Sequence, residues 1–469
     1  MSRRHRSLPA AAIVAATVLA LSPVIGNGFL VVTFDDDAFV LDNPYIRALT
    51  WDNVWACLTR FYHYDYLPLP MLSYLVEFHW WGTDPPGYHL TNLLLHAVNA
   101  VLVFAVAKRA LGTPVAALFA GLIFGLHPVQ LEAVSVVAQR KTLLSTGFVL
   151  GALLAYQVYR SGRRRGYPVA VLLYLCACAS KSSVIPFPFL LLLYDYTFER
   201  ARFRIRDKLP FLALAVVTAG ISAASKLGTE VVKPPQGGSY LITVLAMSRV
   251  MWEYVDAMLL PLNLSPDYYY SRREVFGVLN WVAAAALVLA SLVLWRRRRQ
   301  LRLTFFCAGW VVLCLLPVSN IVPISVLRAD RCLYLPMVAF ALWAGWGLAP
   351  LHEGTAPVGY RLRTVCAGLP AAAMLLLAVL SWQYAFVWRN DVTAWTRTAV
   401  RHPWNARAPY LLARAYMDRQ QFDVARRLAV TAARLDPTFD RPRALLADLD
   451  RLPASSAPAA QDTWPREEN

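Results

Sequence analysis

Charged side chains are scarce in this sequence of 469 residues. Only 16% of the residues are Asp, Glu, Lys or Arg, whereas 58% are hydrophobic, and the mean hydropathy is +0.43. One water-soluble core cannot hide so large a share of apolar side chains. The composition therefore excludes an ordinary soluble protein and indicates a chain that lies in a lipid bilayer.

Cysteine forms no recognisable metal site or disulfide framework. Of the seven cysteines, all except Cys57 lie inside or at the edge of hydrophobic runs, without the spacing of metal ligands. Cys176 and Cys178 are expected to be small packing residues in the lipid zone. A bias toward Ala, Arg and Leu, with no retention or lipidation motif, favours a bacterial cytoplasmic (inner) membrane.

Basic residues exceed acidic ones, but the net charge of +17 does not indicate nucleic acid. The basic residues fall in short clusters between apolar runs, which is how membrane topology is encoded. A basic face also needs a soluble domain that can present a groove to nucleic acid. We therefore expect contacts with membrane lipids and no nucleic-acid partner.

The apolar runs predict an all-α, polytopic membrane protein with about eleven crossings. The first run follows Arg3, Arg4 and Arg6 and has the charge layout of a signal peptide. It is too long for the apolar part of a signal peptide, so we expect a retained first helix. The expected crossings are residues 8–32, 88–107, 114–137, 142–159, 167–179, 183–198, 209–226, 277–295, 303–322, 331–350 and 366–387.

Basic clusters in alternate loops predict the orientation of this membrane domain, residues 1–388. Short loops rich in Arg and Lys stay in the cytoplasm, and every second loop here is of that kind. The N-terminus is therefore expected in the cytoplasm, with the long acidic loop 33–87 and everything after Trp388 on the periplasmic side. The apolar segment 241–262 would break this alternation as a crossing, so we expect it in or against the outer leaflet.

The tail after the last crossing has the pattern of a tetratricopeptide repeat. Its apolar positions recur at the spacing that two antiparallel helices need in order to interlock. Its final residues are rich in Ala, Pro and Ser, which favours disorder. The expected parts are a helix at 391–402, a full repeat at 406–437 and a capping helix at 440–452, together a TPR-like domain at 389–452, followed by a disordered tail at 453–469.

Three aspartates follow the first expected crossing on the outer side. Carboxylates as close as Asp35, Asp36 and Asp37 repel one another, so they need a metal ion, a cationic group or a shared proton. The simpler alternative is a solvated acidic loop. A divalent cation such as Mg²⁺ or Mn²⁺ would take Asp35 and Asp36 as oxygen ligands, and the sequence indicates no other cofactor.

Further charged residues lie on the same predicted side. Glu132, with His127 nearby, sits where the third crossing reaches the outer face, and a carboxylate among apolar neighbours is costly unless it is paired. Basic residues are unusual in external loops, although a lone interfacial cation often only snorkels. The basic residues are Arg140, Lys141, Lys181 and Arg331.

This combination suits the transfer of a group from an anionic lipid phosphate. The cations would hold the phosphate as it leaves, and a carboxylate would take the proton of the acceptor hydroxyl. A polar stripe at helical spacing, which includes His89 and Asn92, is a candidate lining of such a site, as are Asp330 and Tyr334. Hydrogen bonding between helices is the alternative role of the stripe.

Five stretches of the sequence resemble the membrane O-mannosyltransferases that carry tetratricopeptide repeats, together with their bacterial relatives. This family is part of the GT-C superfamily of glycosyltransferases that use lipid-phosphate sugars. The stretches occur in the family's order across nearly the whole chain. They are FDDDAFVLDNPYI, GYHLTNLLLHAVNAVLV, LFAGLIFGLHPVQLEAVSVVAQRKTLLS, ASKSSVIPFPFLLLLYDY and LLPVSNIVPISVLRADRCLYLP.

The resemblance implies a GT-C-like fold with its active site in the first long external loop. It implies a polyprenyl-phosphate-linked sugar as donor, with mannose the first candidate, inversion at the sugar carbon, and a hydroxyl of a protein or surface polymer as acceptor, reached through the TPR-like tail. Asp35 and Asp36 match the family's paired acids, and which of them is the base stays open. The other matches are Glu132 with His127 in the second external motif, and Arg140, Lys141, Lys181 and Arg331 as contacts of the donor phosphate.

The chain departs from the family pattern in its first loop. Relatives have Arg or His before the Pro-Leu of this loop, where the present chain has Tyr66 and Leu67. The alternatives that stay open are a lipid or glycan acceptor for the same fold, and a non-catalytic scaffold whose tail recruits a partner. A transporter is disfavoured, because the charged groups gather on one face and no polar chain crosses the midplane.

Overall fold

The computed structural model describes residues 3–199, 204–227, 234–235, 238–321, 326–353 and 360–451. These residues form helices joined by turns, and none of them forms a strand. The helices before the tail are α1 (Arg3–Leu21), α2 (Trp51–Thr59), α3 (Pro68–Trp81), α4 (Pro85–Leu111), α5 (Pro114–Leu126), α6 (Leu131–Ser135), α7 (Arg140–Arg160), α8 (Gly166–Cys178), α9 (Phe187–Phe198), α10 (Leu209–Ala224), α11 (Tyr240–Leu259), α12 (Arg272–Val275), α13 (Val278–Arg296), α14 (Arg302–Leu315), α15 (Pro336–His352) and α16 (Tyr360–Ala385).

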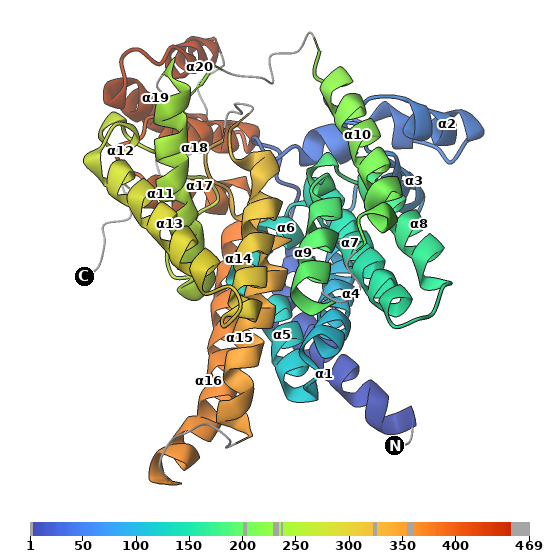
Figure 1. Cartoon of the computed structure of the whole chain (residues 1–469). Helices are drawn as coiled ribbons and strands as arrows, with labels where there is room; N and C mark the ends of the chain where they lie inside the picture. The colour runs from blue at the N-terminus through green and yellow to red at the C-terminus, as the bar shows by residue number, and fades with distance from the viewer. Residues whose placement is uncertain are drawn as a thin grey trace.

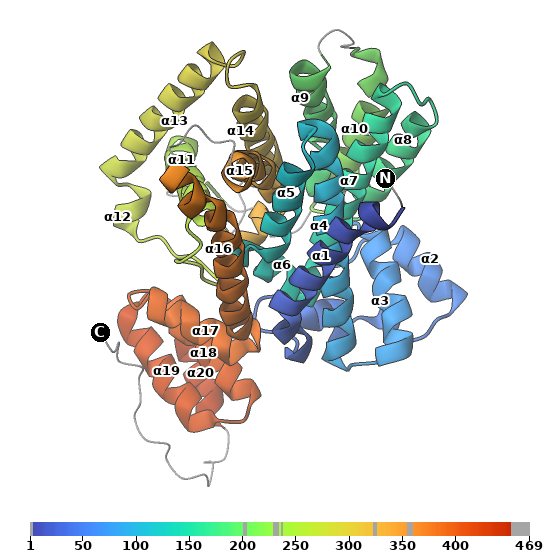
Figure 2. The ribbon, with the colours of Figure 1, turned by 90° about the horizontal axis from the view of Figure 1, so that it is seen from below.

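Different parts of the chain occupy the two ends of the molecule. The first turns of α1 and of α16 lie at one end, at the bottom of Figure 1. The loop helix α2 and the four helices of the tail, within residues 391–450, lie at the other end. Figure 2 shows that the tail helices form a cluster beside α16. Helix α16 therefore brings the tail to the same end of the molecule as the loop that contains α2.

Close helix packing forms the centre of the membrane part. Helix α5 packs between α4 and α15, and α7 packs on α4. A Cβ atom on Gly345 of α15 would lie 2.5 Å from the carbonyl oxygen of Ala116 in α5, and one on Gly121 of α5 would lie 3.1 Å from that of Ala100 in α4. Glycine lets these helix backbones touch, as it does in other packed membrane helices.

A break after α5 brings polar residues to the end of the molecule where the loop lies. The axis of α5 turns by 51° into the segment Pro128–Ser135. His127 is extended because the ring of Pro128 disfavours a helical conformation of the residue before it. The chain then runs through a turn of 3₁₀ helix, Val137–Gln139, into α7. Glu132 and the first residues of α7 thereby lie close together.

The structure confirms a helical membrane protein but gives fewer full-length spans than expected. Six helices of the described residues are long and apolar enough to cross a bilayer, or seven if the bent pair after α4 counts as one span. A span needs about 20 residues, and three further apolar segments are shorter. These segments, Gly166–Cys178, Ser182–Phe198 and Arg302–Val318, carry three of the expected crossings, so the total of about eleven stays a prediction.

The ambiguous segment 241–262 forms α11, which is not one of the spans. Arg249 and Glu253 form an ion pair on this helix at 2.9 Å, and the helix packs against α13. The ion pair suits a position at the edge of a membrane, where charged groups can reach water. Its expected place in the outer leaflet stays a prediction.

The tail forms four short helices that pack in the order of the sequence. Asn390 caps the first of them through reciprocal hydrogen bonds with Thr393. Their assignment as tetratricopeptide repeats stays a prediction, and residues 453–469, expected to be disordered, lie outside the described residues. The helices are α17 (Asp391–Arg401), α18 (Arg407–Asp418), α19 (Phe422–Leu435) and α20 (Arg441–Asp450).

The tail is joined to the segment that follows α1. The N–H of Gly28 donates a hydrogen bond to the carbonyl oxygen of Arg389 at 2.9 Å. The carboxylate of Asp391 accepts hydrogen bonds from the N–H groups of Val31 and Val32 at 3.0 and 3.1 Å. The start of the tail and the start of loop 33–87 therefore lie side by side, as the predicted topology requires.

Candidate active site

Asp35 is held with its side chain partly open to solvent. Its backbone has a φ of 69°, in the left-handed region that Asp and Asn tolerate better than most residues. One carboxylate oxygen lies 3.5 Å from Nε2 of His63, and 42% of the Asp35 side chain is exposed. Burial raises the pKa of this carboxyl group, but His63, Lys141 and Arg331 outweigh burial and hold the pKa below its usual value. Asp35 is therefore an ionised carboxylate beside basic groups.

Asp36 lies in the interior and has a different environment. Its carboxylate accepts hydrogen bonds from the N–H groups of Leu30 at 2.9 Å and Ala138 at 2.7 Å. Burial raises its pKa to about 8, although these backbone groups act in the opposite direction. Asp36 thus ties the segment after α1 to the turn before α7, and the two acids that the sequence left equivalent have distinct surroundings.

Glu132 positions Arg331 from within the protein. The Glu132 side chain is 1% exposed and forms an ion pair with the guanidinium of Arg331. Its second oxygen accepts the backbone N–H of Arg331 at 2.7 Å. This double contact fixes both the backbone and the side chain of Arg331, and the neighbouring Asp330 accepts a hydrogen bond from the hydroxyl of Tyr268 at 2.8 Å.

Two lysines extend the basic group. Lys141 lies 3.7 Å from Asp65, and its ammonium is 4.9 Å from the ring centre of Phe39. Lys181 donates a hydrogen bond to the hydroxyl of Thr142 at 2.8 Å. Burial, followed by the charge of Lys141, lowers the pKa of Lys181 to about 8. This lysine is therefore charged at neutral pH but close to the point at which it loses its proton.

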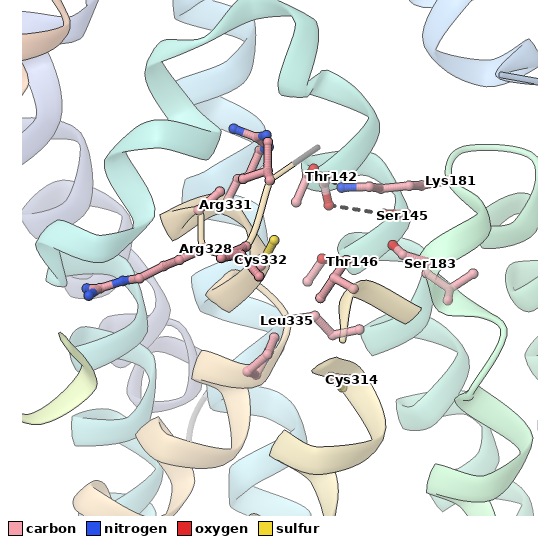
Figure 3. A pocket seen from close by; sticks show the side chains of 16 residues that line it. Thr142, Ser145, Thr146, Lys181, Ser183, Cys314, Arg328, Arg331, Cys332 and Leu335 are labelled. Atoms are coloured by element: carbon pink, nitrogen blue, oxygen red, sulfur yellow. Dashed lines mark hydrogen bonds between the residues drawn. The ribbon is translucent and has the colours of Figure 1, made fainter. Parts of the chain in front are cut away.

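A pocket opens beside these basic residues (Figure 3). It has about 760 Å³ of space including its open side. Lys181 extends toward Thr142 at one side of the pocket, whereas the side chain of Arg328 extends away from Lys181 and Thr142. Arg331 and Lys181 provide the positive charge, whereas Val318 and Leu335 contribute to an apolar wall. Such a pocket can receive an anionic headgroup that is attached to an apolar chain.

Arg140 and Asn92 do not join this group. The Arg140 side chain is fully buried and donates hydrogen bonds to Glu77 at 2.7 Å and to the carbonyl oxygen of Tyr88 at 3.0 Å. It also donates to the side-chain oxygen of Asn92, whose amide nitrogen donates to the carbonyl oxygen of Val134 at 3.2 Å. These contacts bind α7 to α3 and α4, so the Arg140 guanidinium is occupied within the protein.

His89, His127 and Tyr334, which the sequence suggested as site residues, also lie apart from the pocket. His127 approaches the carbonyl oxygen of Met258 at 3.1 Å and accepts the N–H of Val129 at 3.3 Å. Tyr334 lies 2.8 Å from Nδ1 of His96. His89 is fully buried in α4. The polar stripe of α4 thus meets neighbouring segments within the helix bundle and does not line the pocket.

Three residues of this site were not singled out by the sequence. They are His63, Asp65 and Thr142, which contact Asp35, Lys141 and Lys181 respectively. His63 and Tyr64 have positive φ values of 46° and 64°, so the chain turns sharply at this point and returns toward Asp35. No local motif reveals that approach, because it depends on how the whole loop folds.

The described residues do not fit the divalent cation that the sequence left open. Among them, no group of three or more His, Cys, Asp or Glu side chains is arranged to hold a metal ion. Asp36 directs both carboxylate oxygens to backbone N–H groups, so Asp35 and Asp36 do not form a free pair of carboxylate ligands. In this site the positive charge comes from Lys and Arg side chains.

Comparison with known proteins identifies relatives of the chain. The protein O-mannosyl-transferase tmtc2 of Xenopus laevis is 38% identical over 153 residues, which are 31% of this chain and 18% of that protein. Tmtc3 of Drosophila melanogaster is 23% identical over 448 residues, 76% of this chain and 48% of that protein. F38B6.6 of Caenorhabditis elegans, also named a protein O-mannosyl-transferase, is 20% identical over 92% of this chain and 63% of its own length. No family model matches the chain.

Fold and site together define a helical membrane protein with a pocket lined by Lys181 and Arg331, of which Arg331 also acts on the carboxylate of Asp35. The chain is a relative of the protein O-mannosyl-transferases of the tmtc type, as the sequence motifs indicated. It spans less than two thirds of the length of the relatives that it matches.

Proposed function

We propose that this chain is a GT-C-type membrane glycosyltransferase that moves a sugar, with mannose the first candidate, from a polyprenyl phosphate to a hydroxyl group of a protein. The observation that carries the proposal is that Arg331, one of three basic side chains that act on the ionised, accessible carboxylate of Asp35, also lines the pocket. The names of the relatives, protein O-mannosyl-transferase, support the choice of sugar and of a protein acceptor.

Lys181 and Arg331 would bind the donor phosphate, and Lys141 would add charge nearby. Both Lys181 and Arg331 belong to the pocket wall, and the Glu132 contacts fix Arg331 before any donor arrives. Preorganised cations stabilise a leaving phosphate without a cost of rearrangement during the reaction. The apolar part of the pocket wall suits the first isoprene units of the donor.

Asp35 would act as the general base. It takes the proton from the acceptor hydroxyl as the hydroxyl oxygen attacks the sugar carbon and forms the new glycosidic bond. The bond between that carbon and the phosphate oxygen breaks, and the phosphate leaves with the bonding electrons toward Lys181 and Arg331. Attack from the face opposite the phosphate inverts the sugar carbon. Asp36, fixed by Leu30 and Ala138, positions the segment that carries the base.

The topology of the protein is part of the proposal. The three short apolar segments, together with α15 at the expected crossing 331–350, would complete about eleven crossings by tilting or by having a partly wet end. The N-terminus would then lie in the cytoplasm of a bacterial cell, and Asp35, the pocket and the TPR-like tail on the periplasmic face of the inner membrane. The contact between Asp391 and the start of loop 33–87 supports a common side for tail and site.

Asp35→Asn tests the proposal with little disturbance of the backbone. Asn tolerates the left-handed conformation of this residue, so the loop should keep its shape while the base is lost. We expect transfer from mannosyl polyprenyl phosphate to fall by about 10²–10⁴-fold, with donor binding retained. Mass spectrometry of the acceptor protein measures the transfer, and a labelled donor measures the binding.

Asp52→Asn is the matched control, because Asp52 is an exposed aspartate of the same loop in the first turn of α2. It should transfer sugar at the wild-type rate. Wild-type transfer by Asp35→Asn would exclude Asp35 as the base, whereas the absence of transfer by the wild-type protein itself would return the chain to the scaffold alternative. A product on lipid or glycan, with none on protein, would keep the chemistry and change the acceptor class.

A further inference from the structure

A groove between the membrane part and the tail adjoins the pocket. It has about 600 Å³ of space including its open side. The chain that follows α11 forms one wall, and the C-terminal end of α17 forms another. Arg328 belongs to the walls of both cavities, and its guanidinium forms an ion pair with Glu253 of the groove at 3.2 Å. The side chain of Arg328 therefore lies between the groove and the proposed donor site.

Aromatic rings form much of this groove. Tyr268, Tyr269 and Tyr270 are consecutive in the sequence and all contribute to its wall. The ring of His402 stands edge-to-face against Tyr269 at 5.8 Å and against Trp404 at 5.4 Å between ring centres. Trp404 is 52% exposed, so its ring is available to a ligand. Rigid aromatic walls offer a large apolar contact area at low entropic cost.

The charged groups of the groove already have ion-pair or hydrogen-bond partners. Glu253 lies 2.9 Å from Arg249 and 3.2 Å from Arg328. Arg401 donates hydrogen bonds to the side chain of Asn263 at 2.8 Å and to the carbonyl oxygen of Leu262 at 3.1 Å. A strongly charged ligand would have to compete with these contacts, which is costly. The groove therefore suits an uncharged ligand that has both apolar and hydrogen-bonding groups.

We infer that this groove binds the acceptor as an extended, uncharged peptide segment rich in Ser, Thr and Pro; the inference rests on the proposed function. Polyproline-type segments bind aromatic-lined grooves because they are extended before binding and lose little entropy. Sugar chains also stack on aromatic faces, so a mannose oligosaccharide is the competing ligand in the test. Because Arg328 lines both cavities, a peptide in the groove lies next to the wall of the donor pocket.

Peptide binding by the full-length protein in lipid nanodiscs tests the inference without any donor. The probe is a short labelled peptide of Ser, Thr, Pro and Ala, and its affinity is measured by fluorescence polarisation. Trp404→Ala should weaken binding by about tenfold or more, the effect expected of a central aromatic contact. In transfer assays the same variant should raise the KM for the peptide and leave kcat unchanged. Tyr269→Ala, as a second variant, should weaken binding in the same way.

Trp51→Ala is the control, because Trp51 is a tryptophan of α2 with 74% of its surface exposed; it should bind the peptide like wild type. Wild-type peptide affinity in both groove variants, with each shown to be folded by thermal unfolding, would overturn the inference. The inference would also be overturned if a mannose oligosaccharide bound in a way that depends on Trp404 and the peptide did not. Asp35→Asn should bind the peptide normally. Unimpaired sugar transfer by Asp35→Asn would reject the proposed mechanism. Unaltered peptide affinity of Trp404→Ala and Tyr269→Ala would reject only the assignment of the groove as the peptide site.

Discussion

Asp391, the first residue of α17, holds the segment that precedes Asp35. Its carboxylate oxygens accept hydrogen bonds from the N–H groups of Val31 and Val32 at 3.0 and 3.1 Å. Trp395 of the same helix adds a hydrogen bond to the carbonyl oxygen of Val32 at 3.3 Å. Asp391→Ala removes the acceptor of both amides, so we expect it to loosen the segment that carries the proposed base.

The size of this effect follows from the two hydrogen bonds. A buried amide that loses its acceptor costs about 1–3 kcal/mol, and some entry of water reduces the sum to about 2–4 kcal/mol. Because about 1.4 kcal/mol corresponds to a factor of ten, amide exchange over residues 30–36 should accelerate by about 30- to 700-fold. Transfer should also fall, because Asp35 no longer has a fixed position relative to the donor.

Hydrogen exchange read by mass spectrometry measures the opening of this segment. Asp423→Ala is the matched control, since Asp423 is an exposed aspartate in the first turn of another tail helix, α19. Amide exchange of the Asp423→Ala variant over residues 30–36 should equal that of wild type. The reasoning is refuted if Asp391→Ala leaves this segment protected, or if exchange accelerates equally throughout α4 and α7.

Two further predictions concern pH. Because the pKa of Lys181 is lowered to about 8, this lysine loses its charge as the pH rises through 8, and the affinity for the donor should fall there. The Lys181→Arg variant should keep its donor affinity up to pH 9. Titration with a labelled donor measures both affinities. The pKa of Asp36 is raised from 3.8 to about 8, so its contribution to stability is present below about pH 4 and is lost as the pH rises through 8. Asp36→Asn should therefore show a smaller fall in Tm between pH 5 and pH 8.5 than wild type, and an equal fall in both proteins would contradict the assignment.

Sequence patterns predicted which charges share one end of the molecule. Asp35, Lys141, Lys181 and Arg331 come from segments far apart in the chain, and the structure brings them close enough to shift one another's pKa values. The prediction rests on loop charge and helix count, which determine the side on which a residue emerges and can be read along a chain.

Details within each segment could not be predicted in this way. Arg140 and Lys141 are neighbours on α7, and consecutive helical residues point about 100° apart. One therefore faces Glu77 inside the bundle and the other faces Asp65 in the loop. Asp35 and Asp36 diverge for a similar reason, because the amide that captures Asp36 belongs to Ala138, about 100 residues later in the chain. Helix rotation and distant backbone partners leave no local pattern.

The structure also changes what a deletion of the tail can show. Helix α17 contributes Asp391 to the segment before Asp35 at one end and Trp404 to the groove just beyond its other end. Removing the tail would therefore take away a support of the proposed base together with a wall of the proposed acceptor site. Transfer to a lipid, a glycan or a protein should be lost alike, so truncation cannot distinguish these acceptors. Substitutions at Trp404 can, because they leave the contacts of Asp391 in place.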